Sequence, residues 1–238
     1  MRRFCVKSLR RILLFTLVPA FILVLSSVHA VHASFNVKED GFSISNAPGY
    51  CFAMAAFSKW YYLNRQSQAS LRRTLTKQTQ TRIAKELQEF YSKNLIKIQA
   101  DYCNRNNGNQ SSSFRRFLVG LTAGEPRIVL LMNKSSAGAV LHAVLAYAWL
   151  PEGNILKIYD PNYIQEERYL ELDKQIYTSL DITYHAICFP EALEYHPGLL
   201  TKMEYLNAYH GTARRTSAGP VADPEYRRAS ATPMVSDR

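Results

Sequence analysis

The period of hydrophobic and polar positions changes near the middle of this 238-residue chain. Between residues 51 and 121, apolar side chains recur every three or four positions, which is typical of α-helices with one buried face. After residue 126 the period shortens, and Val, Ile, Leu and Tyr become frequent, as they are in β-strands. We therefore expect an α+β fold, with a helical first half and an antiparallel sheet in the second.

The helical pattern predicts a buried central helix over 51–64, two amphipathic helices between 66 and 101, and a short helix over 114–121. A short strand or extended segment is expected over 41–45, before a turn at 46–49. The second half predicts strands over 127–133, 139–150, 154–160 and 182–189, and then a helix around 201–210. The turn-forming residues 151–154 would join the second and third strands as a hairpin.

Both ends of the chain depart from a globular pattern. Basic residues precede an apolar run over 12–25, and Val28-His29-Ala30 and Val31-His32-Ala33 match a signal-peptidase site. Because the run is shorter than the roughly 20 residues of a bilayer span, we expect 1–33 to be a cleaved signal peptide and not an anchor. The protein would then meet a membrane only through this segment and end in the periplasm or outside the cell. Residues 211–238 have no apolar pattern and are expected to be a disordered tail, which leaves 34–210 as the folded domain.

Removal of the signal peptide also changes the charge of the chain. The segment carries five basic residues and no acidic one, so the formal net charge of +10 falls to +5. No block of five or six like charges remains in the mature chain. The excess is typical of a solvated surface, and we expect no nucleic-acid partner.

Three cysteines remain after cleavage: Cys51, Cys103 and Cys188. In an oxidising compartment, a bond between Cys103 and Cys188 would leave Cys51 as a lone thiol, and three free cysteines are the alternative. Cys51 follows a Pro-Gly turn at the start of a predicted helix, where backbone N–H groups and the macrodipole stabilise a thiolate over a thiol. It is therefore a candidate nucleophile, although a small core residue on an apolar face is the other interpretation.

The predicted hairpin brings a histidine toward an acid. In an antiparallel pair the numbers of facing residues have a constant sum, here about 303 or 304, so His142 faces position 161 or 162. Asp160 and Asn162 share parity with His142, and all three side chains can point to one face of the sheet. Taken singly, His142 is typical of a buried core histidine and Asp160 of turn chemistry. Together with Cys51 they match a nucleophile, a base and an orienting acid.

These motifs resemble those of the papain-like cysteine peptidases. Gly49-Tyr50-Cys51-Phe52-Ala53-Met54 is similar to the family's Gly-x-Cys-aromatic-Ala stretch at the start of its central helix. His142-Ala143-Val144 resembles its His-Ala-Val strand, and Ile158-Tyr159-Asp160-Pro161-Asn162 resembles the strand end that bears the acid. The Asp-Pro ending is more similar to that of the bacterial branch, which includes the C39-type bacteriocin-processing peptidases, than to that of plant papain. The resemblance implies a papain-like fold and a Cys51, His142, Asp160 triad that acts without a cofactor on peptides or proteins through an acyl-enzyme.

The chain departs from the family at the oxyanion donor. The family usually places a Gln several residues before the cysteine, and none is present here. Asn46 is the nearest amide and could serve with the backbone N–H of Cys51, while a plain turn residue is the other interpretation. Asn162, beside Asp160, is the second auxiliary residue that we expect.

Three alternatives stay open at this point. The same triad would serve an amidase, a deamidase or an acyltransferase. A catalytically silent binding module is also compatible with the missing Gln, and its groove could be lined by Tyr61, Tyr62, Tyr91, Tyr102, Tyr163 and Tyr169. The triad residues are zinc-ligand types as well, but no close pair such as Cys-x-x-Cys is present, and we expect no metal site.

Overall fold

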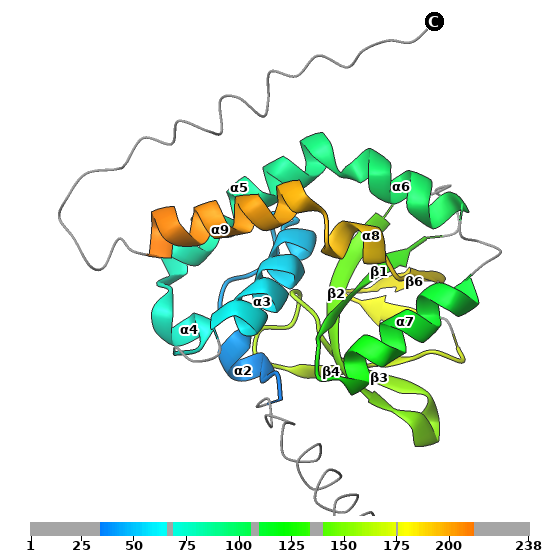
Figure 1. Ribbon diagram of the computed structural model, residues 1–238. Coiled ribbons are helices and arrows are strands. Elements are labelled where there is room, and N and C mark those ends of the chain that lie inside the picture. The colour runs from blue at the N-terminus through cyan, green and yellow to red at the C-terminus, as the bar shows by residue number, and fades with distance from the viewer. Residues whose placement is uncertain (1–33, 66–68, 106–109, 134–139, 175, 212–238) are drawn as a thin grey trace, which may run out of the picture. The chain divides into compact units, whose positions relative to one another are not determined.

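The computed structural model describes residues 34–65, 69–105, 110–133, 140–174 and 176–211. The predicted signal peptide over 1–33 lies outside these residues, and so does the predicted tail apart from residue 211. No described helix is both long and apolar enough to cross a membrane. The described residues confirm the α+β class, with eight α-helices and an antiparallel five-stranded sheet (Figure 1).

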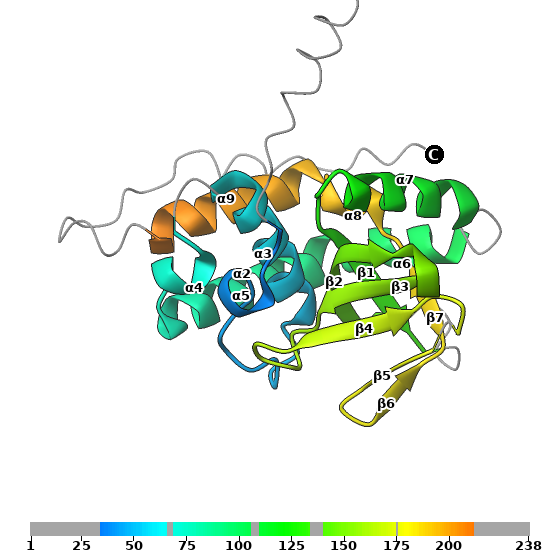
Figure 2. The same ribbon diagram turned by 90° about the horizontal axis from the view of Figure 1, so that it is seen from below.

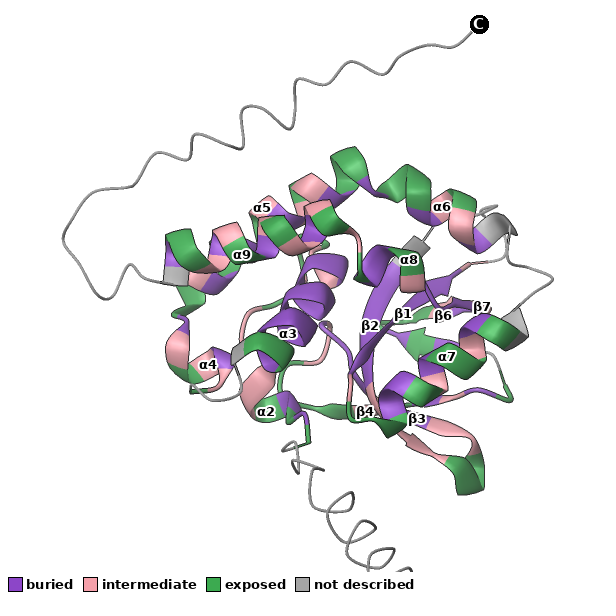
Figure 3. Ribbon diagram, viewed as in Figure 1, coloured by how far each residue is buried: buried purple, intermediate pink, exposed green. Residues whose placement is uncertain are grey.

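Helices dominate the first half, as predicted. They are α2 (Val37–Asp40), α3 (Cys51–Arg65), α4 (Leu71–Thr74), α5 (Lys77–Asn94), α6 (Ile96–Arg105) and α7 (Gln110–Thr122). The predicted central helix is α3, and its residues 52–62 are all buried (Figure 3). The region where the pattern predicted two helices holds three. The short α4 stands apart because Thr76 caps α5, its hydroxyl accepting the Thr79 N–H at 3.2 Å.

The second half forms a sheet with strand order β4-β3-β2-β1-β7, in which all neighbours are antiparallel. Its strands are β1 (Arg127–Met132), β2 (Val140–Leu150), β3 (Ile155–Tyr159), β4 (Glu167–Glu171) and β7 (Ala186–Cys188). The predicted hairpin joins β2 to β3 through the 3₁₀ turn η2 (Pro151–Gly153). A separate two-stranded sheet pairs β5 (Tyr177–Ser179) with β6 (Ile182–Tyr184). Two further helices, α8 (Glu191–Glu194) and α9 (Pro197–Gly211), end the described chain.

The strand prediction for the last part of the sheet was wrong in two ways. The strand expected over 182–189 is two strands, β6 and β7, which pair with different partners. Neither β4 nor β5 was predicted, because β4 is a polar edge strand, Glu-Arg-Tyr-Leu-Glu, and β5 has only three residues. Neither sequence has enough apolar alternation to indicate a strand.

Two hydrophobic cores lie on opposite faces of the sheet. On one face α3 packs against β2 and also against α5, which lies beside α9 (Figure 1). On the other face α7 packs against β1 and β2. Side chains of β1 alternate between the two cores, with Leu130 in the first and Leu131 in the second. All six residues of β1 are therefore buried.

The segment over 41–45, expected as a short strand or an extended stretch, belongs to neither sheet. Side chains hold it instead of a strand ladder. The Phe42 N–H donates to the Tyr159 hydroxyl at 3.1 Å, and Arg72 donates to the carbonyls of Gly41 and Phe42 at 2.8 and 2.7 Å. A Cβ at Gly41 would lie 2.8 Å from the Tyr159 ring, so only glycine fits there. These contacts fix the chain that leads into α3.

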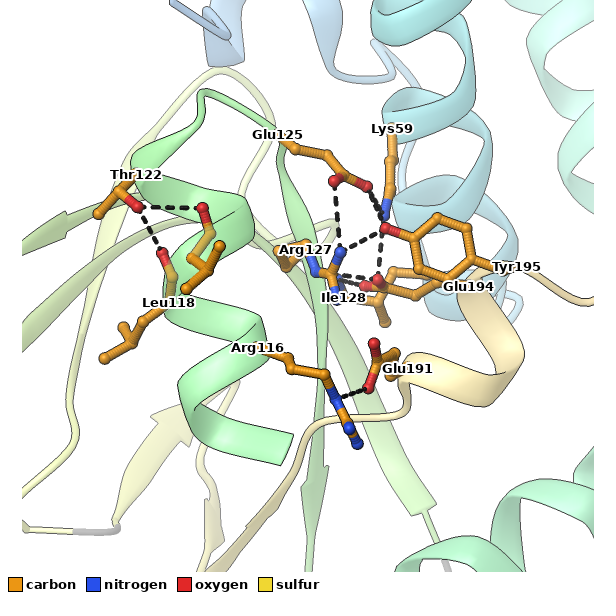
Figure 4. A network of polar contacts seen from close by, with 11 residues as sticks. Lys59, Arg116, Leu118, Thr122, Glu125, Arg127, Ile128, Glu191, Glu194 and Tyr195 are labelled. Carbon is orange, nitrogen blue, oxygen red and sulfur yellow. Dashed lines mark hydrogen bonds and ion pairs between the residues drawn. The ribbon is translucent and has the colours of Figure 1, made fainter. Parts of the chain in front are cut away.

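A buried ionic network joins α3, β1 and α8 (Figure 4). Glu194 is central to it, with Lys59 Nζ at 3.0 Å and Arg127 Nε at 3.1 Å from its Oε2. Glu125 contacts the same two cations at 2.9 and 3.3 Å, and the Tyr195 hydroxyl donates to Glu125 at 2.6 Å. Two cations thus face two carboxylates, and the network fastens α3 to the sheet.

Candidate active site

Cys51 is the first residue of α3 and is half-buried. A turn delivers it: the Gly49 N–H donates to the Asn46 carbonyl at 2.7 Å, and Gly49 has a positive φ of 81°. Cys103 and Cys188 form a disulfide that joins α6 to β7, with their Cα atoms 5.8 Å apart. Cys51 is the free cysteine of the described residues.

Side chains from α5 hold the first turn of α3 in place. The Ala53 N–H, which has no helical partner at this position, donates to Gln88 Oε1 at 3.2 Å. One residue earlier, the Phe52 ring stacks on Tyr91 with centroids 3.8 Å apart. Gln88 was not a candidate from the sequence, because it reaches the helix start from 35 positions away. The position of Cys51 therefore depends on α5 as well as on the preceding turn.

His142 and Asp160 are brought together by the β2–β3 hairpin. The observed register pairs Leu145 with Tyr159 and Ala146 with Ile158, which leads His142 toward position 162 as predicted. His142 Nε2 lies 2.6 Å from Asp160 Oδ1, and both side chains are almost fully buried. The hairpin thus supplies a histidine–carboxylate pair shielded from water.

Four hydrogen bonds saturate the Asp160 carboxylate among the described residues. Oδ1 accepts from His142 Nε2 and from the Asn162 backbone N–H at 2.9 Å. Oδ2 accepts from the Tyr177 hydroxyl at 2.8 Å and from the Ser179 hydroxyl at 2.9 Å. Tyr177 and Ser179 were missed by the sequence analysis. The Tyr-x-Ser alternation after residue 176 is the one local signal of a strand face there, and it is too short to stand out.

This arrangement determines the tautomer of His142. Asp160 accepts hydrogen bonds that stabilise its ionised form, so the proton of the shared hydrogen bond lies on His142 Nε2. The Asn162 side-chain nitrogen, 3.4 Å from Nε2, faces another donor there and makes no hydrogen bond with it. Nδ1 is then the one ring nitrogen of His142 left to accept a proton.

The electrostatics of the site favour a protonated imidazole. Burial alone would lower the pKa of His142, but hydrogen bonds to Asp160 and to the Cys51 thiol group, with the negative charges of both, raise this pKa to about 9. Burial would also raise the pKa of Asp160, yet the hydrogen bond and charge of His142, with donors from Asn162 and Tyr177, hold it below its usual range. The site therefore favours an imidazolium held against an ionised carboxylate.

The two asparagines predicted as auxiliary residues lie together. Asn46 Nδ2 donates to Asn162 Oδ1 at 2.7 Å, and Asn162 Nδ2 donates to the Ser179 hydroxyl at 2.8 Å. One N–H of Asn46 is therefore committed to Asn162, while its buried Oδ1 has no hydrogen-bond partner among the described residues. Whether Asn46 also serves as an oxyanion donor stays a prediction.

Several other expectations concern residues away from this site. Tyr61, Tyr62 and Tyr91 are buried in the first core. The prediction that these three could line the groove of a binding module was therefore wrong. Within the described ranges, no group of three His, Cys, Asp or Glu side chains is placed to hold a metal ion.

Comparison of the chain with protein-family models, with curated proteins and with solved structures finds no match.

Proposed function

We propose that this protein is a papain-like cysteine hydrolase, with peptides or proteins as substrates. The observation that carries the proposal is the buried His142–Asp160 pair beside Cys51: the imidazole Nε2 is bound to the carboxylate, and half-buried Cys51 is one of the groups that raise the pKa of this imidazole. The motif resemblance to papain-like peptidases supports the same assignment. The proposed signal peptide would export the protein, and the disulfide between Cys103 and Cys188 is in keeping with an oxidising compartment.

In the proposed mechanism, His142 Nδ1 takes the proton of Cys51, and the thiolate attacks the acyl carbon of the substrate. Asp160 stabilises the imidazolium and keeps the ring oriented. The tetrahedral intermediate collapses as His142 returns the proton to the leaving amine, so the acyl group stays on Cys51 as a thioester. Water then attacks the thioester with His142 as base, which releases the acid and restores the thiol.

The backbone N–H of Cys51 would be one oxyanion donor and the second N–H of Asn46 the other. Loss of one such donor typically reduces turnover by about 10²–10³-fold. An amine or alcohol acceptor in place of water would make the protein an acyltransferase with the same residues, and an amide substrate would make it an amidase or deamidase.

A second candidate is a binding module that keeps the fold without turnover. The bond between Asn46 and Asn162 favours it. Asn46 is the nearest side-chain amide before Cys51, and this bond uses one of the two N–H groups that could otherwise serve as oxyanion donors. The two candidates differ in the chemistry of Cys51, which is directly measurable.

The test is the pH dependence of iodoacetamide labelling of the mature protein, mapped to Cys51 by mass spectrometry. We expect rapid labelling below pH 7 that slows at least tenfold in His142→Ala, since a thiolate stabilised by an imidazolium reacts at a pH where a free thiol does not. Incubation with p-nitrophenyl acetate should then place an acetyl group on Cys51 before hydrolysis. Slow labelling of Cys51, unchanged in His142→Ala, would exclude the hydrolase and favour the binding module.

A further inference from the structure

The hairpin of β5 and β6 stands outside the five-stranded sheet (Figure 2). It completes neither edge of that sheet, and its two strands have three residues each. An isolated two-stranded hairpin is marginally stable in water, so contacts with the rest of the protein must hold it in place. Those contacts converge on the candidate active site.

One face of the hairpin is directed at the His142–Asp160 pair. Tyr177 and Tyr184 face each other across the strands, and Ser179 shares the face of Tyr177. All three are buried, whereas Thr178 on the other face is exposed. The Tyr177 and Ser179 hydroxyls both donate to Asp160 Oδ2, and the Tyr184 ring lies along the His142 ring, with centroids 5.8 Å and planes 24° apart.

The two central residues of the hairpin turn are of types that do not favour its backbone conformation. They are Leu180 and Asp181, which have positive φ values of 45° and 65°. Two-residue hairpin turns need such angles and normally use Asn or Gly there, and a leucine is strained in this region. A hydrogen bond from the Leu180 N–H to the Tyr163 hydroxyl at 3.1 Å supports the turn from outside. The turn therefore does not stabilise the hairpin in its position; the contacts of its buried face do.

The two hydroxyls have a specific effect on the carboxylate. They occupy Oδ2 and so leave Oδ1 for His142 and for the Asn162 backbone N–H. Without them the carboxylate could rotate about its Cβ–Cγ bond and present either oxygen to the imidazole at a poorer angle. The hydrogen bond that orients His142 toward Cys51 would then weaken.

We propose that the β5–β6 hairpin is a clamp for the Asp160 carboxylate, with Tyr177 and Ser179 as positioning residues and Tyr184 covering the imidazole. This inference rests on the proposed function, because it assigns these residues through the Cys51–His142 pair. None of the three touches the reacting sulfur in this assignment. They act by keeping His142 Nδ1 aimed at the thiol.

The test compares the double variant Tyr177→Phe/Ser179→Ala with a matched control, Thr178→Val. The control removes a 3.2 Å hydroxyl contact with Thr183 on the outer face of the same hairpin. We expect the double variant to label at Cys51 about tenfold more slowly at pH 6, because two hydrogen bonds to a charged group are lost. At pH 9.5, where thiols ionise unaided, its rate should match the wild type, and Thr178→Val should match at both values.

Each outcome decides a different statement. A role in stability alone would lower the melting temperature and change the labelling rate equally at both pH values, which would overturn the proposal. Equal pH profiles for the double variant and the wild type would overturn it too, provided that labelling of the wild type depends on His142. If the wild type shows no dependence on His142, the proposed function itself fails. Should the double variant not fold, Tyr177→Phe alone, which keeps the ring, decides by the same two rates.

Discussion

The cluster around Glu194 and the cluster around Asp160 both bury a carboxylate, but they surround it differently. Glu194 lies between two permanent cations, Lys59 and Arg127, and each charge in that cluster meets an opposite one. Asp160 instead receives hydroxyl and amide hydrogens and one titratable ring, that of His142. Among the described residues, the charged groups of the first cluster are paired with one another. The second leaves Nδ1 of His142 outside the bond to the carboxylate, and Cys51 is one of the groups that raise the pKa of this ring.

This difference separates a cluster that holds elements together from one suited to chemistry. Permanent charges that neutralise each other give geometry and specificity, and breaking one pair leaves a buried ion without compensation. A titratable ring bound to a fixed carboxylate gives a proton acceptor whose pKa is set by its surroundings. Variants in the two clusters should therefore affect different measurements.

The largest effect is expected from Glu194→Ala. It leaves Lys59 and Arg127 buried beside one carboxylate instead of two, which should lower the free energy of unfolding by about 3–5 kcal/mol. Urea denaturation followed by circular dichroism measures this. The control is Glu191→Ala, whose partner Arg116 is 60% exposed, and its cost should stay below about 1 kcal/mol. Equal costs for the two variants would contradict a structural role for the Glu194 network.

Asp160→Asn should have a different profile, with a smaller loss of stability than Glu194→Ala beside a large loss of reactivity. The amide keeps the shape of the carboxylate but removes the negative charge that stabilises the His142 imidazolium. If the lost charge is equivalent to one to two pKa units, alkylation of Cys51 at pH 6 should be about 10–100-fold slower. Rates are measured by mass spectrometry on the folded variant. An unchanged rate would mean that Asp160 only fills space.

The smallest effect concerns the titration of His142, followed by NMR of ¹⁵N-labelled imidazole groups. Because the pKa of His142 is raised to about 9, its ring should stay protonated above the ordinary value of about 6.5 and lose the proton as pH rises through 9. Cys51→Ala removes a hydrogen bond and a negative charge that favour the imidazolium, so the pKa should fall. Thr178→Val should leave it in place. A midpoint near 6.5 in the wild type would contradict the coupling between thiol and imidazole.

The sequence was sufficient where the pattern is local or periodic. Hydrophobic alternation and the turn over 151–154 fixed the β2–β3 register closely enough to bring His142 and Asp160 together. The one irregularity of that pair lies between Ala146 and Ala148, on the turn side of the paired Leu145 and Tyr159, so it does not shift the residues that lead to the site. The start of α3 at Cys51 was likewise readable from its Pro-Gly turn.

The contacts that complete the site were not readable in this way. Gln88 reaches α3 from another helix, and Tyr177 and Ser179 come from a three-residue strand. The ionic network joins Lys59 to Glu194, which are 135 positions apart. Such contacts depend on tertiary packing and leave no period in the sequence, and a polar residue in a short segment has the same appearance whether it is solvated or buried.

The order of the strands along the chain also determines when each part of the candidate site can form during synthesis. Residues emerge from the N-terminus onward, so Cys51, β1, β2 and β3 are made before the hairpin of β5 and β6 and before β7, which pairs with β1 at the far edge. Until residue 179 has emerged, Asp160 lacks its hydroxyl partners, and until residue 188 has emerged, Cys103 lacks the cysteine to which it is joined. If the proposed function holds, an unfinished chain would have the Cys51 thiol without an aligned base, and the late segment that carries β5, β6 and β7 would complete both the site and the sheet.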